Sequence, residues 1–135
     1  MIRVLTIDGD RGRAQTLAME CLERGVAVRI AETLCEGVRY LLDAPVSLVL
    51  AEAAMLRIAG PDRARLFDVV APGVPVVLTV DAGTRMEDLV DLELQGFQVV
   101  SRPFALDDLI AKIELPVTTA PALRDARARV EAGCR

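Results

Sequence analysis

Acidic, hydroxyl and basic side chains follow several short apolar runs of this 135-residue sequence. The first run ends in Asp8-Gly9-Asp10, and carboxylates of this kind are ligands for hard divalent cations. Thr79 ends a later run and Arg102 follows the last one, a pair suited to an anion or a nucleotide. The complete set of candidate site residues is Asp8, Gly9, Asp10, Glu52, Thr79 and Arg102.

Several of these residues also have a purely structural interpretation. Asp8 and Asp10 would begin a loop and cap the helix that follows, because Asp is favoured at helix N-caps. Thr79 would be a buried hydroxyl at the end of a strand. Residues 82–85 have neither the spacing nor the lysine of a phosphate-binding loop, so we interpret them as an ordinary loop.

The absence of histidine excludes more functions than any other feature of the composition. It removes Ser-His-Asp and Cys-His catalysis, histidine-ligated metals and a phosphoryl-carrying histidine. The net charge of -4 argues against nucleic-acid binding, which needs clustered Lys and Arg. No apolar stretch reaches the roughly 18 to 20 residues of a membrane span, so we expect a cytoplasmic protein.

The apolar residues predict the fold class. Hydrophobic residues make up 53% of the sequence and aromatic residues only 3%, which favours a buried parallel sheet of aliphatic strands over a β-sandwich. The length fits one domain. Cys21, Cys35 and Cys134 are widely spaced and odd in number, which indicates reduced thiols. We interpret Cys21 and Cys35 as small hydrophobic residues.

Apolar runs alternate with segments of helical periodicity, which predicts βα units. The predicted strands are residues 3–7, 27–31, 47–51, 74–79 and 97–101. The predicted helices are residues 13–24, 34–42, 61–70, 85–95 and 105–113. Gly25 and Gly96 end two of the helices, and Thr84 is a candidate cap. The apolar faces of the first two helices are expected to include Ala14, Leu17, Ala18, Cys21 and Leu22, and Val38, Leu41 and Leu42.

Short right-handed crossovers between these strands predict a doubly wound α/β fold. We expect a five-stranded parallel sheet in the flavodoxin-like order 2-1-3-4-5, as the middle layer of a three-layer α/β/α sandwich. The candidate site residues then gather where the strands end. Residues 1–115 would form this domain. Residues 116–135 would be a linker and a tail in which 120–132 form a short amphipathic helix or are disordered.

The strand ends resemble those of response-regulator receiver (CheY-like) domains. Residues 4–10, Val-Leu-Thr-Ile-Asp-Gly-Asp, are similar to the first strand and acidic cluster of these domains. Residues 48–55 resemble the strand whose terminal aspartate accepts phosphate and is followed by a methionine. Residues 75–79 end on a hydroxyl, and residues 101–104 resemble a Lys-Pro-Phe turn. The resemblance covers residues 2–114 in the right order.

In an intact receiver, the resemblance implies a magnesium ion between the acidic cluster and the acceptor aspartate. This sequence departs from that pattern at three positions. Gly9 replaces an acidic residue, which leaves Asp8 and Asp10 as weak metal candidates, so we expect little or no magnesium binding. Glu52 replaces the acceptor aspartate, and its extra methylene displaces the carboxylate. Arg102 replaces the lysine, and we expect it to pair with Glu52.

Two further departures concern phosphoryl access and the switch between states. Val80 stands where receivers usually have a smaller residue that admits the phosphoryl group. Val99 occupies the switch position, where an aromatic residue commonly reports activation. The resemblance also implies a cis peptide before Pro103.

Together these features predict a pseudo-receiver that acts in two-component signalling by docking to proteins and is not an enzyme. The expected partner is a histidine kinase, an output protein or another signalling protein. A homodimer through the fourth helix, fifth strand and fifth helix is a further expectation. Two alternatives stay open: a receiver that still accepts phosphate, and a flavodoxin-like domain that binds a small molecule.

Overall fold

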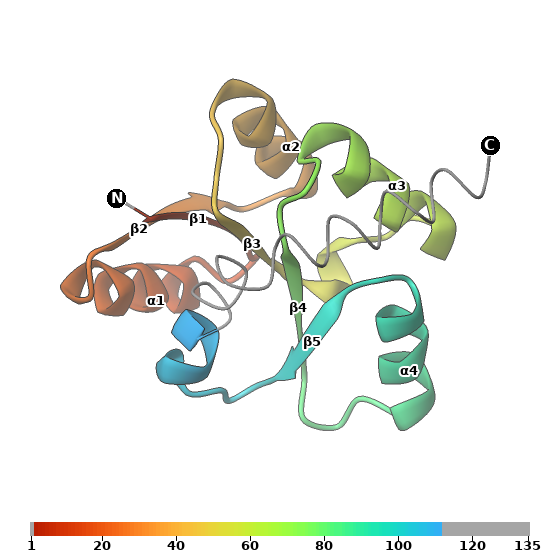
Figure 1. The fold of residues 1–135 in the computed structure, drawn as a ribbon. Helices are drawn as coiled ribbons and strands as arrows, with labels where there is room; N and C mark the ends of the chain where they lie inside the picture. Colours follow the sequence, from red (N-terminus) through yellow and green to blue (C-terminus); the bar gives the residue numbers. More distant parts are fainter. Residues whose placement is uncertain (1, 112–135) are drawn as a thin grey trace. The chain divides into compact units, whose positions relative to one another are not determined.

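The structure, a computed structural model, describes residues 2–111. The chain consists of two compact units, Met1–Phe104 and Ala105–Arg135. The first unit contains a five-stranded parallel sheet in the order β2-β1-β3-β4-β5 (Figure 1). This order and the parallel pairing confirm the predicted fold.

The strands lie within two residues of their predicted bounds. They are β1 (Ile2–Ile7), β2 (Val26–Ala31), β3 (Leu48–Glu52), β4 (Val76–Val80) and β5 (Gln98–Ser101). β4 begins later than predicted, after Pro75, which has no N–H to donate to a ladder. The carbonyl of Pro75 still accepts a hydrogen bond from the Val49 N–H at 3.0 Å.

Four α-helices and one short 3-10 helix connect the strands of the first unit. They are α1 (Arg11–Glu23), α2 (Leu34–Asp43), η1 (Ala53–Met55), α3 (Gly60–Val70) and α4 (Met86–Leu94). Gly25 and Gly96 adopt φ values of 76° and 97°, the left-handed conformation that follows many helix ends. These two glycines therefore end α1 and α4 as predicted.

The helices cover both faces of the sheet (Figure 1). The crossover from β1 to β2 runs in the opposite direction to the later crossovers, so right-handed connections place α1 on one face and α2, α3 and α4 on the other. Alternate strand residues pack with the three-helix layer: Leu5, Ile7, Val49, Ala51, Leu78 and Val80 cluster with Leu41, Phe67 and Leu92. The chain thus forms the predicted three layers.

α2 lies unusually close to β1. A Cβ on Gly37 would lie 2.6 Å from Ile7 Cδ1, a distance that ordinary packing does not allow. Glycine at this position is therefore what lets the helix approach the strand. Ile7 is the last residue of β1 and directly precedes Asp8.

Some predicted local features are wrong. Leu22 and Leu42 are 62% and 71% exposed, because each lies one position beyond the buried residues Cys21 and Leu41. Cys21 is a buried free thiol as expected, whereas Cys35 is a free thiol on the exposed surface of α2.

Thr84 does not cap α4. Its hydroxyl donates to the carbonyl of Asp81 at 2.7 Å, and the N-cap residue is Arg85. The threonine therefore stabilises the turn after β4 instead of the start of the helix.

The second unit is helical from residue 106 to residue 111. This segment agrees with the start of the predicted fifth helix, and the rest of that helix lies outside the described residues. The predicted boundary at residue 115 and the tail 116–135 also lie outside them. Among residues 2–111, no helix is long and apolar enough to cross a membrane.

Candidate functional site

The parallel register brings the candidate residues to one edge of the sheet. Ile7 pairs with Ala51, and Glu52 pairs with Thr79, so β1, β3 and β4 end side by side. β5 ends next to β4 and is followed by Arg102, whose backbone N–H donates to the Val80 carbonyl at 2.9 Å. Asp8, Gly9, Glu52, Thr79 and Arg102 therefore all lie at this edge.

Arg13 is the cation nearest to Asp8. Its Nε donates to Asp8 Oδ2 at 2.8 Å and its Nη2 donates to Asp8 Oδ1 at 2.6 Å, a two-pronged contact of the strong kind. The same Nη2 lies 3.2 Å from Glu52 Oε2. One guanidinium thus joins the carboxylates at the ends of β1 and β3.

The start of α1 explains why Arg13 reaches this place. Asp10 is the N-cap, and its Oδ1 accepts from the Arg13 backbone N–H at 3.0 Å. The Asp10 N–H in turn donates to Asp8 Oδ1 at 2.9 Å. The cap interpretation of Asp10 is therefore correct. Because Asp10 ends the loop, Arg13 lies in the first turn of α1 and points back over β1.

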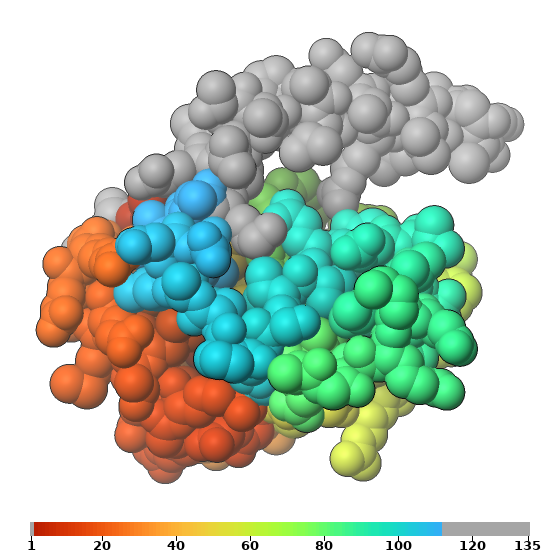
Figure 2. All heavy atoms as spheres, turned by 90° about the horizontal axis from the view of Figure 1, so that it is seen from below, coloured from red at the N-terminus to blue at the C-terminus, as the bar shows by residue number. Residues whose placement is uncertain are grey.

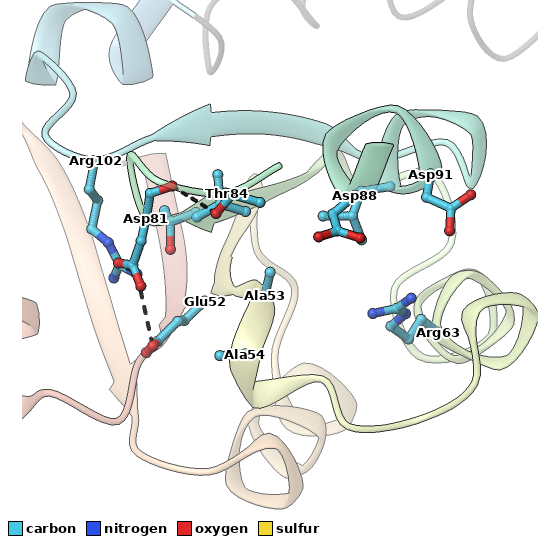
Figure 3. Close-up of a pocket in the computed structure, with 12 residues that line it drawn as sticks. Glu52, Ala53, Ala54, Arg63, Asp81, Thr84, Asp88, Asp91 and Arg102 are labelled. Atoms are coloured by element: carbon cyan, nitrogen blue, oxygen red, sulfur yellow. Dashed lines mark hydrogen bonds and ion pairs between the residues drawn. The ribbon is translucent and has the colours of Figure 1, made fainter. Parts of the chain in front are cut away.

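Arg102 contacts two carboxylates. Its Nη2 lies 3.0 Å from Asp81 Oδ1 and 3.9 Å from Glu52 Oε1. The expected pair of Arg102 with Glu52 is present at long range, and the shorter contact is with Asp81. Figure 3 shows Arg102 and Asp81 above Glu52 at one side of the pocket. Among the described residues, Nε and Nη1 of Arg102 are buried without a hydrogen-bond partner.

A cavity of about 310 Å³ opens beside these residues. It lies between the loops that follow β3 and β4, and Figure 3 shows Arg63, Asp88 and Asp91 on its far side from Arg102. Its walls carry charges of both signs. Thr79 is buried in its wall.

Burial and the Arg13 contact shift the two carboxyl groups in opposite directions. Burial raises the pKa of Asp8, but hydrogen bonds from Arg13 and from the Asp10 N–H lower it by more, so this pKa lies below its ordinary value. Burial and the adjacent Asp8 raise the pKa of Glu52 above its ordinary value despite the opposing charges of Arg102 and Arg13. Asp8 is therefore the more firmly ionised group.

The space beside Gly9 is occupied by Met55. A Cβ on Gly9 would lie 3.3 Å from Met55 Sδ, so a larger residue at this position requires the methionine to shift. Both oxygens of Asp8 already accept hydrogen bonds from a cation. In residues 2–111, Asp, Glu and Cys side chains form no group of three that could hold a metal ion. In this arrangement the Asp8 and Glu52 carboxylates both contact the Arg13 guanidinium.

The residues next to the strand ends are hydrophobic. Val80 is buried in the core at the end of β4, and Val99 is partly buried against the same core. The Arg102–Pro103 peptide is cis, as the resemblance implied.

Sequence reasoning missed Arg13 and Asp81. The available signal for Arg13 was the Asp10 cap, since a residue three positions after an N-cap lies in the first helical turn and near the preceding strand end. For Asp81, the signal was its place directly after β4.

The comparisons with known proteins agree with this fold. No family model matches the chain. The transcriptional regulatory protein GlrR of Escherichia coli K12 is 28% identical over 127 residues, which cover 93% of this chain and 28% of that protein. A probable transcriptional regulatory protein, SilR of Salmonella typhimurium, is 25% identical over 112 residues, which cover 83% of this chain and 49% of that protein.

Solved structures decide the fold. A two-component response regulator from Clostridium difficile superposes with a TM-score of 0.75 at 19% identity, over 87% of this chain and 97% of that chain. The fold is that of a response-regulator receiver domain. The receiver-like chain spans between about a quarter and a half of the two curated relatives named above.

One similar structure bears the name of an enzyme. An adenylate cyclase from Rhodopirellula baltica matches with a TM-score of 0.70 at 18% identity, over 96% of both chains. At this identity the match shows only the shared fold. It assigns no reaction to this receiver-like chain.

Proposed function

We propose that this receiver-like domain serves two-component signalling by docking to a protein partner, without magnesium-dependent phosphorylation. The observation that carries the proposal is the guanidinium of Arg13, which contacts Asp8 at 2.6 and 2.8 Å and Glu52 at 3.2 Å. A phosphotransfer site needs a cation that can bind the incoming phosphoryl oxygens. Here Nε and Nη2 of Arg13 already donate to the carboxylates at this edge.

The carboxylate at the acceptor position supports the same proposal. Glu52 lies between Arg13 and Arg102, and its longer side chain moves the carboxylate outward from the position of an aspartate. A reacting group tolerates such an outward displacement poorly. In this proposal Glu52 is a carboxylate held between two guanidinium groups and does not accept phosphate.

Phosphodonor treatment tests the proposal directly. The full chain is incubated with magnesium and acetyl phosphate, and its intact mass is measured beside that of Glu52→Gln. We expect no phosphate on either protein. A gain of one phosphate that Glu52→Gln loses would overturn the proposal and favour a receiver that still accepts phosphate.

Magnesium titration tests the metal step separately. Amide shifts of Asp8, Gly9 and Glu52 are followed while magnesium is added to the wild-type chain. We expect no saturable change centred on these residues, because Arg13 occupies the carboxylates. Saturable shifts at Asp8 and Glu52 would contradict this expectation.

A further inference from the structure

A groove opens between the ends of two neighbouring helices, α2 and α3. It has a volume of about 300 Å³ and is lined by the last residues of these helices and by the segments that lead into β3 and β4. Figure 1 shows α2 and α3 side by side. The groove lies where β3 and β4 begin, whereas the candidate site lies where the strands end. The two surfaces are therefore separate.

The lining of the groove is apolar. Every residue that lines it has an apolar side chain except Asp43. A closed cavity of about 150 Å³ is enough to hold a benzene molecule, so this groove has room for a leucine side chain. Leu42 lines the groove and is itself 71% exposed, which places this side chain at the mouth. An exposed leucine beside an apolar hollow indicates a contact surface.

The charged residues beside Leu42 have opposite signs. Arg39 and Asp43 are both exposed, and they lie four positions apart on α2, so their side chains project about 40° apart around the helix axis. A base followed by an acid is the weaker order for a pair at this spacing. Among the ion pairs of residues 2–111, none involves Arg39 or Asp43.

Asp43 lies at an unfavourable place for a carboxylate. It is the last residue of α2, where the unpaired carbonyl groups of a helix concentrate negative partial charge. The last turn of α2 contains no basic residue. A cation supplied from another molecule would therefore stabilise both the carboxylate and the helix end.

A second copy of α2 supplies that cation. In a two-fold dimer the same surface meets itself. When two α2 helices pack antiparallel and cross at the level of Leu41, Arg39 of each copy lies opposite Asp43 of the other, because both are two residues from the crossing point. The same crossing brings the Leu42 side chain of each copy to the groove of the other. A partner with charges of one sign would instead repel either Arg39 or Asp43.

We infer that α2 and the groove beside it form a homodimer interface, in which Leu42 of each copy enters the groove of the other and Arg39 pairs with Asp43 across the two-fold axis. The inference goes beyond the proposed function and does not rest on it. It uses a different face from the homodimer expected through α4. One helix pair buries less surface than a standard interface, so we expect a dissociation constant on the order of micromolar.

Sedimentation equilibrium of the full chain over a concentration series tests the inference. Leu42→Ser should raise the dissociation constant of the dimer roughly tenfold or more, because every dimer loses two buried leucines. Circular dichroism confirms that the variant is folded.

Another exposed leucine provides the matched control. Leu94 is the last residue of α4 and is 79% exposed. In Figure 2 the segment that contains α4, coloured teal, lies open on the face shown. Leu94→Ser removes a similar apolar side chain from this other helix, so it should dimerise as the wild type does.

The ion pairs are tested by an exchange of charges. Arg39→Asp alone and Asp43→Arg alone each bring like charges together across the axis, so each should weaken the dimer. Arg39→Asp with Asp43→Arg restores opposite charges and should dimerise more tightly than either single variant. Added salt should weaken the wild-type dimer without removing its dependence on Leu42.

Three results would overturn the inference: a full chain that stays monomeric at high concentration, equal weakening by Leu42→Ser and Leu94→Ser, or a double charge variant no tighter than the single ones. In a monomer, a change in the Leu42 amide shift on removal of residues 116–135 would assign the groove to that tail instead. The measurements contain neither magnesium nor phosphodonor. A chain that becomes phosphorylated yet dimerises through α2 would therefore contradict only the proposed function.

Discussion

Asp8 accepts from three donors at the end of β1: Nε and Nη2 of Arg13, and the backbone N–H of Asp10. Its side chain is only 11% exposed. A carboxylate with so little contact with water depends on these donors for its charge. Arg13 is thus the residue on which the electrostatics of the site depend.

Arg13→Ala is expected to destabilise the fold by roughly 2 kcal/mol at neutral pH, because a buried carboxylate loses its charged partner. Urea unfolding measures the change, and Arg11→Ala, which removes an exposed pair 3.5 Å from Glu32, is the control. A loss no larger than that of the control would contradict the role given to Arg13.

The same variant has a defined pH dependence. The pKa of Asp8 lies below its ordinary value of 3.8, so its contribution to stability is present above that value and is lost as the pH falls through the folded-state pKa. The stability difference between wild type and Arg13→Ala should therefore shrink at acid pH. A difference that stays constant from neutral to acid pH would contradict this assignment.

Glu52→Gln should change the stability of the fold in the opposite direction from Arg13→Ala. The pKa of Glu52 lies above its ordinary value of 4.5, so its ionised form is disfavoured in the fold and stability is lost as the pH rises through the folded-state pKa. We expect Glu52→Gln to be more stable than wild type at neutral pH, and the gain to vanish as acid protonates Glu52. Thermal unfolding across this pH range measures both effects.

At the level of elements, the contact of α2 with β1 depends on the glycine at position 37. Gly37→Ala would place a Cβ 2.6 Å from Ile7 Cδ1, and such overpacking typically costs about 1 to 3 kcal/mol. Gly12→Ala is the matched control, because the atom nearest to a Cβ on Gly12 would be Asp10 Oδ1 at 3.6 Å. Chemical denaturation should distinguish the stabilities of the two variants. A Gly37→Ala variant with the stability of the wild type would show that α2 can move outward freely.

The elements were predictable from the sequence because each strand is a short aliphatic run between turn residues. Gly25 and Gly96 ended their helices in the predicted places. The faces of short helices were less predictable, since one residue of error turns a helix by about 100°. Leu22 and Leu42 were assigned to the core for this reason and are exposed.

For the site, the sequence predicted which residues lie at the strand ends but not how their side chains pair. The topology placed Asp8, Glu52 and Arg102 at one edge, but side-chain pairing depends on rotamers that a sequence does not specify. The partner of Asp8 came from the helix that follows it, through the Asp10 cap. The shorter contact of Arg102 with Asp81 likewise depends on side-chain rotamers.

For the whole molecule, we expect four substitutions together to restore phosphorylation: Gly9→Asp, Arg13→Ala, Glu52→Asp and Arg102→Lys. They return an acidic pair, an acceptor of normal length and a lysine, and they remove the competing guanidinium. Met55 beside Gly9 has a flexible side chain that can shift by the few tenths of an ångström required.

Intact-mass analysis with acetyl phosphate and magnesium checks this variant. The control carries Glu52→Asn in place of Glu52→Asp and should gain nothing. A folded repaired protein that stays unphosphorylated would show that residues beyond these four block the chemistry.

The guanidinium that joins Asp8 to Glu52 is made by the ribosome with the rest of the chain and needs no enzyme to install or remove it. On the proposed function, no phosphatase can reset such a pocket. The strength of its signal would then follow the number of copies the cell makes and degrades, so synthesis and turnover would do the work that a kinase does elsewhere.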